Sequence, residues 1–226
     1  RINEKLMGIR RGELIVMTSG TGIGKSSVCR ELVCHLVRCG KKVGVLMLEE
    51  SVKRTSQNLM GIHLNCPPYW WKEREISEEQ KREAFDATVG QVVLFDHFGS
   101  VDPENLLARV RYMTKALGCE YVFLDHLSIV VSGLGDGDER RLIDNTMTAL
   151  RSLVEETQIA LFVVSHLRRP AGEQGHEQGA QTSLSQLRGS HSIAQLSDAV
   201  IGFERDQQDE ENGNLLVLRV LKNRYT

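Results

Sequence analysis

No stretch of apolar residues in this sequence approaches the roughly 18 that a membrane-spanning helix requires, so we expect no membrane segment. The first residues do not show the pattern of a secretory signal peptide either, so we expect none there. No C-x-x-C pair occurs among the cysteines, so the sequence predicts no zinc site. The absence of a disulfide framework indicates free thiols in a reducing intracellular compartment. The cysteines are Cys29, Cys34, Cys39, Cys66 and Cys119.

An excess of basic residues is absent too, because 28 lysines and arginines face 30 aspartates and glutamates, for a net charge of −2. This balance excludes a generally basic nucleic-acid-binding protein, so any nucleic-acid site must be a local patch. The 226 residues suffice for one α/β domain with a sizeable core. Because the chain stops at "VLKNRYT", within an expected strand, we expect residues 1–226 to be one domain of a longer protein.

Short apolar runs that end in polar residues recur along the chain. They are "ELIVMTS", "KVGVLMLEE", "QVVLFDH", "EYVFLDH" and "IALFVVSH". Such near-continuous runs are typical of strands buried on both faces of a parallel sheet. Helical patterns lie between them, at residues 102–118 and 138–156, and the alternation predicts a wound α/β sheet. Two further strands, at 199–205 and 214–224, have no long helix between them, so we expect them to pair antiparallel at one side.

The helix expected at residues 102–118 shows its ends clearly. Asp102 is a plausible N-cap, Pro103 occupies the first helical position and Gly118 closes the helix. Two other segments interrupt the regular alternation. Residues 61–90 contain both tryptophans and a Pro-Pro pair, and we expect a variable excursion there. Residues 167–183 are polar and glycine-rich, and long loops of this kind inside a domain are usually functional or disordered.

The stretch "SGTGIGKS" lies between an apolar strand and a helical pattern, which is the context of a phosphate-binding loop. Glycines let backbone N–H groups converge on phosphate oxygens, and the following helix adds a favourable dipole. Lys25 is expected to reach the β- and γ-phosphates, and Ser26 to bind Mg²⁺. Ser19 stands where the consensus has glycine, a position that accepts a small residue. The expected nucleotide-binding residues are Ser19, Gly20, Thr21, Gly22, Ile23, Gly24, Lys25, Ser26 and Ser27.

Polar residues at the ends of other expected strands supply further candidates. Asp125 ends "YVFLD" and would hold Mg²⁺ through a water molecule. Glu49 and Glu50 follow another strand; adjacent strand residues point to opposite faces, so we expect only one to face the nucleotide and activate water. Alternatively, both are solvated or helix-capping charges. His166 ends "FVVSH" and either senses the γ-phosphate or is an ordinary surface histidine.

A series of ordered motifs resembles the RecA-like motor domain of the DnaB family of hexameric replicative helicases. Within that family, the helicase halves of phage primase-helicases and the mitochondrial helicase Twinkle are most similar. The resemblance runs from about Gly8 to Thr226 and is weakest over residues 61–90. It implies a RecA-like P-loop NTPase fold, with a mostly parallel central sheet flanked by helices. The motifs are "TSGTGIGKS", "LMLEES", "YVFLDHLSIVVS", "VVSHL", "LRGSHSIAQLSDAVIGFERDQ" and "LKNRYT".

The resemblance implies roles that the residue patterns alone leave open. Glu50 matches the catalytic base, and His166 matches the γ-phosphate sensor. Gln195 lies in a motif that links nucleotide state to DNA, and Arg205 borders the pocket for the base. Arg224 matches an arginine finger that reaches the nucleotide of the neighbouring subunit.

Residues 167–183 match the loop that faces the central channel of the ring and binds DNA. Arg168 falls where the family has a basic DNA contact, and Arg169 and Arg188 are further candidates. Phage relatives carry several lysines in this loop, whereas this chain continues with "PAGEQGHEQG". Backbone N–H groups of a glycine-rich loop can also bind phosphates.

The resemblance implies a replicative DNA helicase that translocates on single-stranded DNA as a ring and unwinds duplex. Its cofactors would be ATP, dTTP or another triphosphate, together with Mg²⁺. Its partners would be single-stranded DNA, further copies of itself in a hexamer, and a DNA polymerase and a primase. The alternatives are a RecA-type recombinase that forms filaments, or a P-loop ATPase that does not bind DNA.

Overall fold

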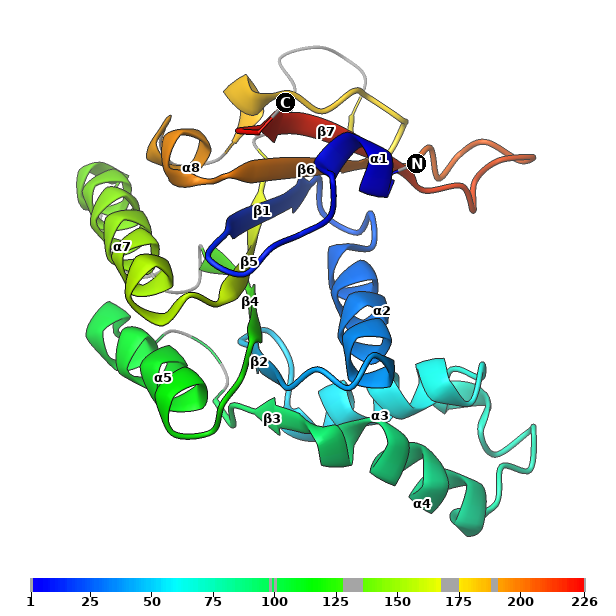
Figure 1. Ribbon diagram of the computed structural model, residues 1–226. Helices are drawn as coiled ribbons and strands as arrows, with labels where there is room; N and C mark the ends of the chain where they lie inside the picture. Colours follow the sequence, from blue (N-terminus) through cyan, green and yellow to red (C-terminus); the bar gives the residue numbers. More distant parts are fainter. Residues whose placement is uncertain are drawn as a thin grey trace.

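The computed structural model describes residues 2–97, 99, 101–127, 136–167, 175–187 and 191–225. These residues form a seven-stranded sheet in the order β3-β2-β4-β5-β1-β6-β7 (Figure 1). Neighbouring strands pair parallel, except for β6 and β7, which pair antiparallel as predicted. The strands are β1 (Leu14–Ser19), β2 (Val43–Met47), β3 (Val92–Leu94), β4 (Tyr121–Asp125), β5 (Ala160–His166), β6 (Ala199–Glu204) and β7 (Val217–Asn223).

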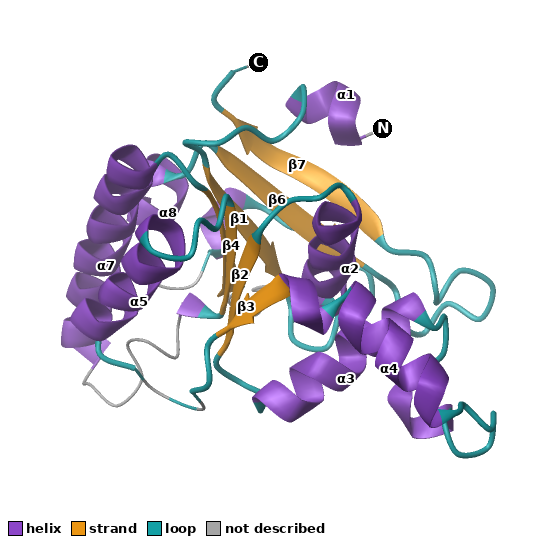
Figure 2. Cartoon of the chain, turned by 60° about the horizontal axis from the view of Figure 1, so that its bottom comes forward, coloured by secondary structure: helices purple, strands orange, loops and turns teal. Residues whose placement is uncertain are grey.

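Helices cover both faces of this sheet. Figure 2 shows α2, α3 and α4 on one face and α5, α7 and α8 on the other, while α1 lies beside β7. The helices are α1 (Ile2–Leu6), α2 (Lys25–Arg38), α3 (Val52–His63), α4 (Glu78–Ala87), α5 (Pro103–Lys115), α7 (Asp136–Thr157) and α8 (His191–Leu196). Short 3₁₀ helices are η1 (Pro68–Trp70), η2 (Val89–Gln91) and η3 (Leu184–Gln186). None of the helices in the described part of the chain has the length and apolar character needed to cross a membrane.

The core is divided by the sheet into two apolar clusters. Along β1, Leu14 and Val16 join the cluster beneath α5 and α7, whereas Ile15 and Met17 join the cluster beneath α2 and α3. All six residues of β1 are buried, which explains why its sequence is continuously apolar from Leu14 to Met17 rather than alternating. The expected strands and both expected helices are therefore confirmed.

Three expected details of α5 are also confirmed. The Asp102 side chain accepts a hydrogen bond from the backbone N–H of Asn105, and Pro103 starts the helix. Gly118 follows the helix with a φ of 72°, a left-handed conformation that favours glycine.

The two segments that interrupt the regular alternation pack against the wound sheet in different ways. Within residues 61–90, η1 and α4 pack beside α3, and the indole of Trp71 donates to the Cys66 carbonyl at 2.9 Å. Leu167, at the start of residues 167–183, bridges to Leu187. The loop at 175–182 runs past the end of β6, where the backbone N–H of Thr182 donates to Glu204. Residues 168–174 lie outside the described part.

Candidate nucleotide site

Four parallel strands end at one edge of the sheet and bring the predicted site residues together. In the β1–β5 register Ser19 pairs with His166, and in the β2–β4 register Met47 pairs with Asp125. The carboxyl ends of β1, β2, β4 and β5 therefore share an edge. Ligands of wound α/β sheets bind at this edge.

The phosphate loop connects β1 to α2 as predicted. Gly22 and Gly24 have φ values of 78° and 114°, a left-handed backbone that glycine adopts without strain. The Nζ of Lys25 lies inside the loop, where it donates to the Gly20 carbonyl at 2.9 Å and the Ser19 hydroxyl at 3.1 Å. Burial lowers the pKa of this lysine. Its partners are neutral oxygens, so phosphate oxygens entering the loop would be stronger acceptors for the same ammonium group.

Ser26 and Asp125 meet beside this lysine. The Ser26 hydroxyl donates to the Asp125 carboxylate at 2.5 Å. Burial raises the pKa of Asp125, so the ionised carboxylate is poorly compensated in this setting. A hydroxyl and a carboxylate are the hard oxygen donors that Mg²⁺ prefers, and a bound cation would offset the burial of the negative charge. The residues present therefore fit a magnesium ion.

The two adjacent glutamates have different surroundings, because β2 ends at Met47 and both lie in the turn that follows. Glu50 accepts from Arg30 at 2.8 Å and from the Thr55 hydroxyl at 2.8 Å, and its side chain is 11% exposed. Glu49 has a side chain that is 52% exposed, and one carboxylate oxygen lies 2.8 Å from Nε2 of His126. The contacts thus anchor Glu50 to the neighbouring helices and leave Glu49 beside the strand ends.

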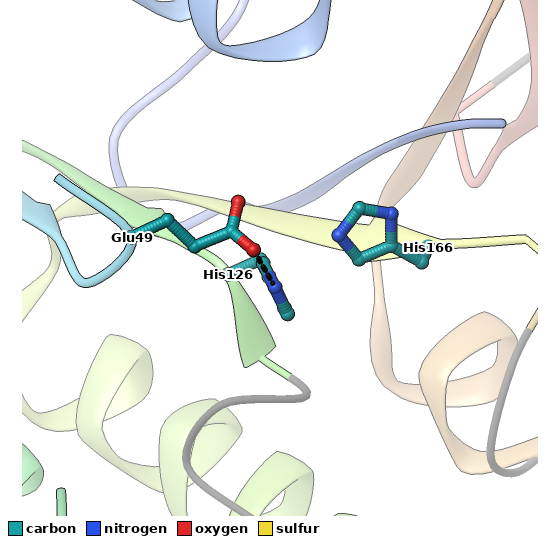
Figure 3. A group of neighbouring side chains, drawn as sticks. All are labelled: Glu49, His126 and His166. Carbon is teal, nitrogen blue, oxygen red and sulfur yellow. Dashed lines mark hydrogen bonds and ion pairs between the residues drawn. The ribbon is translucent and has the colours of Figure 1, made fainter. Parts of the chain in front are cut away.

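Glu49, His126 and His166 form a compact group (Figure 3). One donor atom from each lies within 4.8 Å of the other two. The rings of His126 and His166 meet edge to face, with centroids 4.2 Å apart and an interplanar angle of 88°. The sequence interpretation missed His126, although "FLDH" shows it directly after Asp125 at the end of a buried strand.

Arg224 and Gln195 lie at the other end of the sheet from the phosphate loop. The Arg224 guanidinium donates to Asp198 at 2.8 Å and to the Gln195 carbonyl at 3.3 Å. Asp198 also accepts from the backbone N–H of Leu14, at the start of β1. At about 3.3 Å per residue, β1 separates this cluster from the phosphate loop by roughly 17 Å. The structure therefore does not bring either residue to the phosphate loop of its own chain.

The connection from β6 to β7 lies on the phosphate-loop side. Arg205 donates to the Gly213 carbonyl at 2.5 Å and to the Asn214 side chain at 3.1 Å. Nearby, the Gln207 amide donates to the Gly22 carbonyl of the phosphate loop at 3.0 Å, a contact that the sequence interpretation missed. The predicted DNA contacts Arg168, Arg169 and Arg188 lie outside the described residues.

A phosphate loop on a wound, mostly parallel sheet, with a lysine, a serine and a strand-end aspartate in contact, defines a P-loop NTPase of RecA-like architecture. The model of the DnaB-like helicase C-terminal domain family matches residues 1–226. The chain therefore belongs to this family of replicative helicase domains, and nucleotide binding is implied by that membership.

The chain is similar to named relatives in sequence and in structure. It is 39% identical over 231 residues to a DNA helicase/primase of Enterobacteria phage T3, covering all of this chain and 41% of the relative. The ATPase domain of G40P superposes with a TM-score of 0.79 at 18% identity, covering 96% of this chain and 79% of that one. A DnaB-like replicative helicase superposes with a TM-score of 0.83 at 17% identity, covering 99% of this chain and 56% of that one. The chain thus spans about two fifths of the phage relative, and the structural neighbours show the fold.

Proposed function

We propose that this chain is the motor domain of a ring-forming helicase, which uses nucleoside triphosphate hydrolysis to move along single-stranded DNA and separate a duplex. The observation that carries the proposal is that the groups proposed to act in catalysis lie at two ends of the sheet. Lys25, Ser26 and Asp125 lie at one end, and Arg224 lies at the other. An arginine in this position can complete a phosphate site only on another copy, which favours a ring or filament of subunits.

The nucleotide would be held by the phosphate loop. Backbone N–H groups of the loop and the start of α2 bind phosphate oxygens, and the Lys25 ammonium neutralises the β- and γ-phosphates. Ser26 and Asp125 would hold Mg²⁺, which neutralises phosphate charge when bound. Arg205, on the same side as the loop, would border the base of the nucleotide. The triphosphate would be ATP, dTTP or a related nucleotide.

Glu49, in place of Glu50, is the carboxylate that we propose as general base. Its exposed side chain lies in one group with His166 and interacts electrostatically with Lys25, whereas the Glu50 carboxylate is already held by Arg30 and Thr55. A general base must approach the proton that it removes, so a carboxylate fixed by two other partners is less suited to activate water. His166 would contact the γ-phosphate from the end of β5 and relay its state into residues 167–183.

DNA would pass along those residues in the channel of a hexameric ring. Arg168, Arg169 and Arg188 would contact DNA phosphates, and Gln195 would link the neighbouring nucleotide to this movement through its contact with Arg224. Primase and DNA polymerase would be partners of the whole protein. The T3 relative is named as a helicase/primase, which supports the primase part of this proposal.

The test is hydrolysis and fork unwinding by the full-length protein, measured with and without single-stranded DNA. We expect DNA to stimulate hydrolysis and unwinding to require the triphosphate, while Lys25→Ala abolishes both. Electron microscopy of the same sample distinguishes closed rings from the open filaments of a recombinase. Active hydrolysis that DNA leaves unchanged, without unwinding, would instead favour a P-loop ATPase that does not act on DNA.

A further inference from the structure

The proposed general base needs an orienting partner. Glu49 has a half-exposed side chain with several rotatable bonds, so its carboxylate must be restrained to face a water molecule. The Nε2 of His126 lies 2.8 Å from Oε1 of Glu49, within hydrogen-bond distance. This contact occupies one carboxylate oxygen and leaves the second oxygen to accept a proton.

His126 is itself held in place. It is buried, and its ring meets the ring of His166 edge to face at 4.2 Å. The backbone also fixes the pair, because the N–H of Leu48 donates to the carbonyl of Asp125 at 2.7 Å. Leu48 precedes Glu49 and Asp125 precedes His126, so this bond sets the two residues side by side. Figure 3 shows the resulting arrangement, in which His126 lies against the Glu49 carboxylate.

We propose that His126 is a positioning residue, which orients the Glu49 carboxylate through Nε2 and is held in register by the His166 ring. The inference rests on the proposed role of Glu49 as general base. His126 donates a hydrogen bond to the glutamate and is not among the residues that we propose to hold the triphosphate. Its loss should therefore lower kcat and leave nucleotide affinity nearly unchanged, because misplacing a catalytic group by about 1 Å can cost about 10²-fold in rate.

Substitutions that differ only in reach test the idea. The amide nitrogen of Gln lies near the position of a histidine Nε2, whereas Asn carries the same amide one carbon shorter. We expect His126→Asn and His126→Phe to lower kcat by about 10²-fold. His126→Gln should restore most of the rate. The nucleotide Kd and the Tm should be measured on each full-length variant. Both should stay close to the wild-type values for His126→Asn and His126→Gln.

A double-mutant cycle separates positioning from a general structural effect. If His126 acts through Glu49, adding His126→Asn to Glu49→Gln should not lower the residual single-turnover rate further. Multiplied losses in the double variant, equal rates for the Asn and Gln variants, or a wild-type rate for His126→Asn would each overturn the proposal. A wild-type rate for Glu49→Gln alone would instead overturn the base assignment, so the two failures are distinguishable.

Discussion

Glu204 gives a prediction whose size can be worked out from its contacts. This carboxylate ends β6, is 7% exposed, and accepts from the backbone N–H and hydroxyl of Thr182 at 2.7 and 2.8 Å. The Arg219 guanidinium of β7 donates to it at 2.7 and 2.9 Å. Glu204 therefore ties residues 175–182, which return from the proposed DNA loop, to the strands beside the phosphate loop.

The proposed change is Glu204→Gln, which keeps the shape and removes the charge. Hydrogen bonds to charged groups contribute about 1.5–3 kcal/mol each, and breaking a fully buried ion pair costs about 3–5 kcal/mol. The Arg219 side chain is 40% exposed, so water can solvate its charge after the substitution. The loss in free energy of unfolding should therefore lie toward the low end of these ranges. We expect Glu204→Gln to lower the free energy of unfolding by about 2–3 kcal/mol, which for a chain of this size lowers Tm by about 4–12 °C.

The stabilisation by the Glu204 carboxylate should depend on pH, and the direction of this dependence follows from its pKa. Burial by itself would raise the pKa of Glu204, but the bonds from Arg219 and Thr182 outweigh it and hold the pKa below its ordinary value. The stabilisation is therefore complete above the ordinary glutamate pKa of about 4.3 and is lost as the pH falls through the lowered folded-state pKa. The Tm difference between wild type and Glu204→Gln should be largest at neutral pH and shrink toward acid pH.

The assay is thermal unfolding followed by circular dichroism across this pH range. Glu156→Gln is the matched control, because Glu156 also pairs with an arginine, Arg111, but on the surface, where removing the charge should leave Tm unchanged. A Tm difference for Glu204→Gln that is within error at neutral pH, or that stays constant as the pH falls, would refute the reasoning.

Other substitutions give separate tests. Asp125→Asn should abolish hydrolysis. Without nucleotide its Tm should equal or exceed that of wild type, because burial disfavours the aspartate charge and the amide oxygen still accepts from Ser26. A clear drop in Tm would contradict this. Arg168→Ala should flatten the log–log salt dependence of single-stranded DNA binding by ~0.7, and an unchanged slope would place Arg168 away from the phosphates. Mixing Arg224→Ala with Glu49→Gln subunits should recover part of the hydrolysis, since each supplies the group that the other lacks; mixed rings without recovered activity would argue against a finger acting between subunits.

Much of the fold could be predicted because its signals are local. The inner parallel strands are buried on both faces and read as continuous apolar runs, and α5 carries its cap and its closing glycine within its own sequence. The phosphate loop was equally visible, because its function requires glycines, lysine and serine at a fixed spacing. The antiparallel pairing of β6 and β7 could be predicted because no long helix lies between them.

The choice between Glu49 and Glu50 could not be made in this way. Strand alternation decides which side a residue faces only within the strand, and β2 ends before either glutamate. Their directions are decided by distant partners, Arg30 from α2 and His126 from the end of β4. The position of Arg224 follows from topology, since β7 runs antiparallel to β6 and ends at the edge of the sheet where β6 and β1 begin.

The most direct test of the account is single-turnover hydrolysis by Glu49→Gln and Glu50→Gln in the full-length protein, with nucleotide binding measured in parallel. The two substitutions are adjacent and chemically identical, so they differ only in which carboxylate is removed. The account predicts that Glu49→Gln binds the triphosphate and fails to cleave it, while Glu50→Gln retains most of its activity. Normal cleavage by Glu49→Gln, with loss in Glu50→Gln, would contradict it.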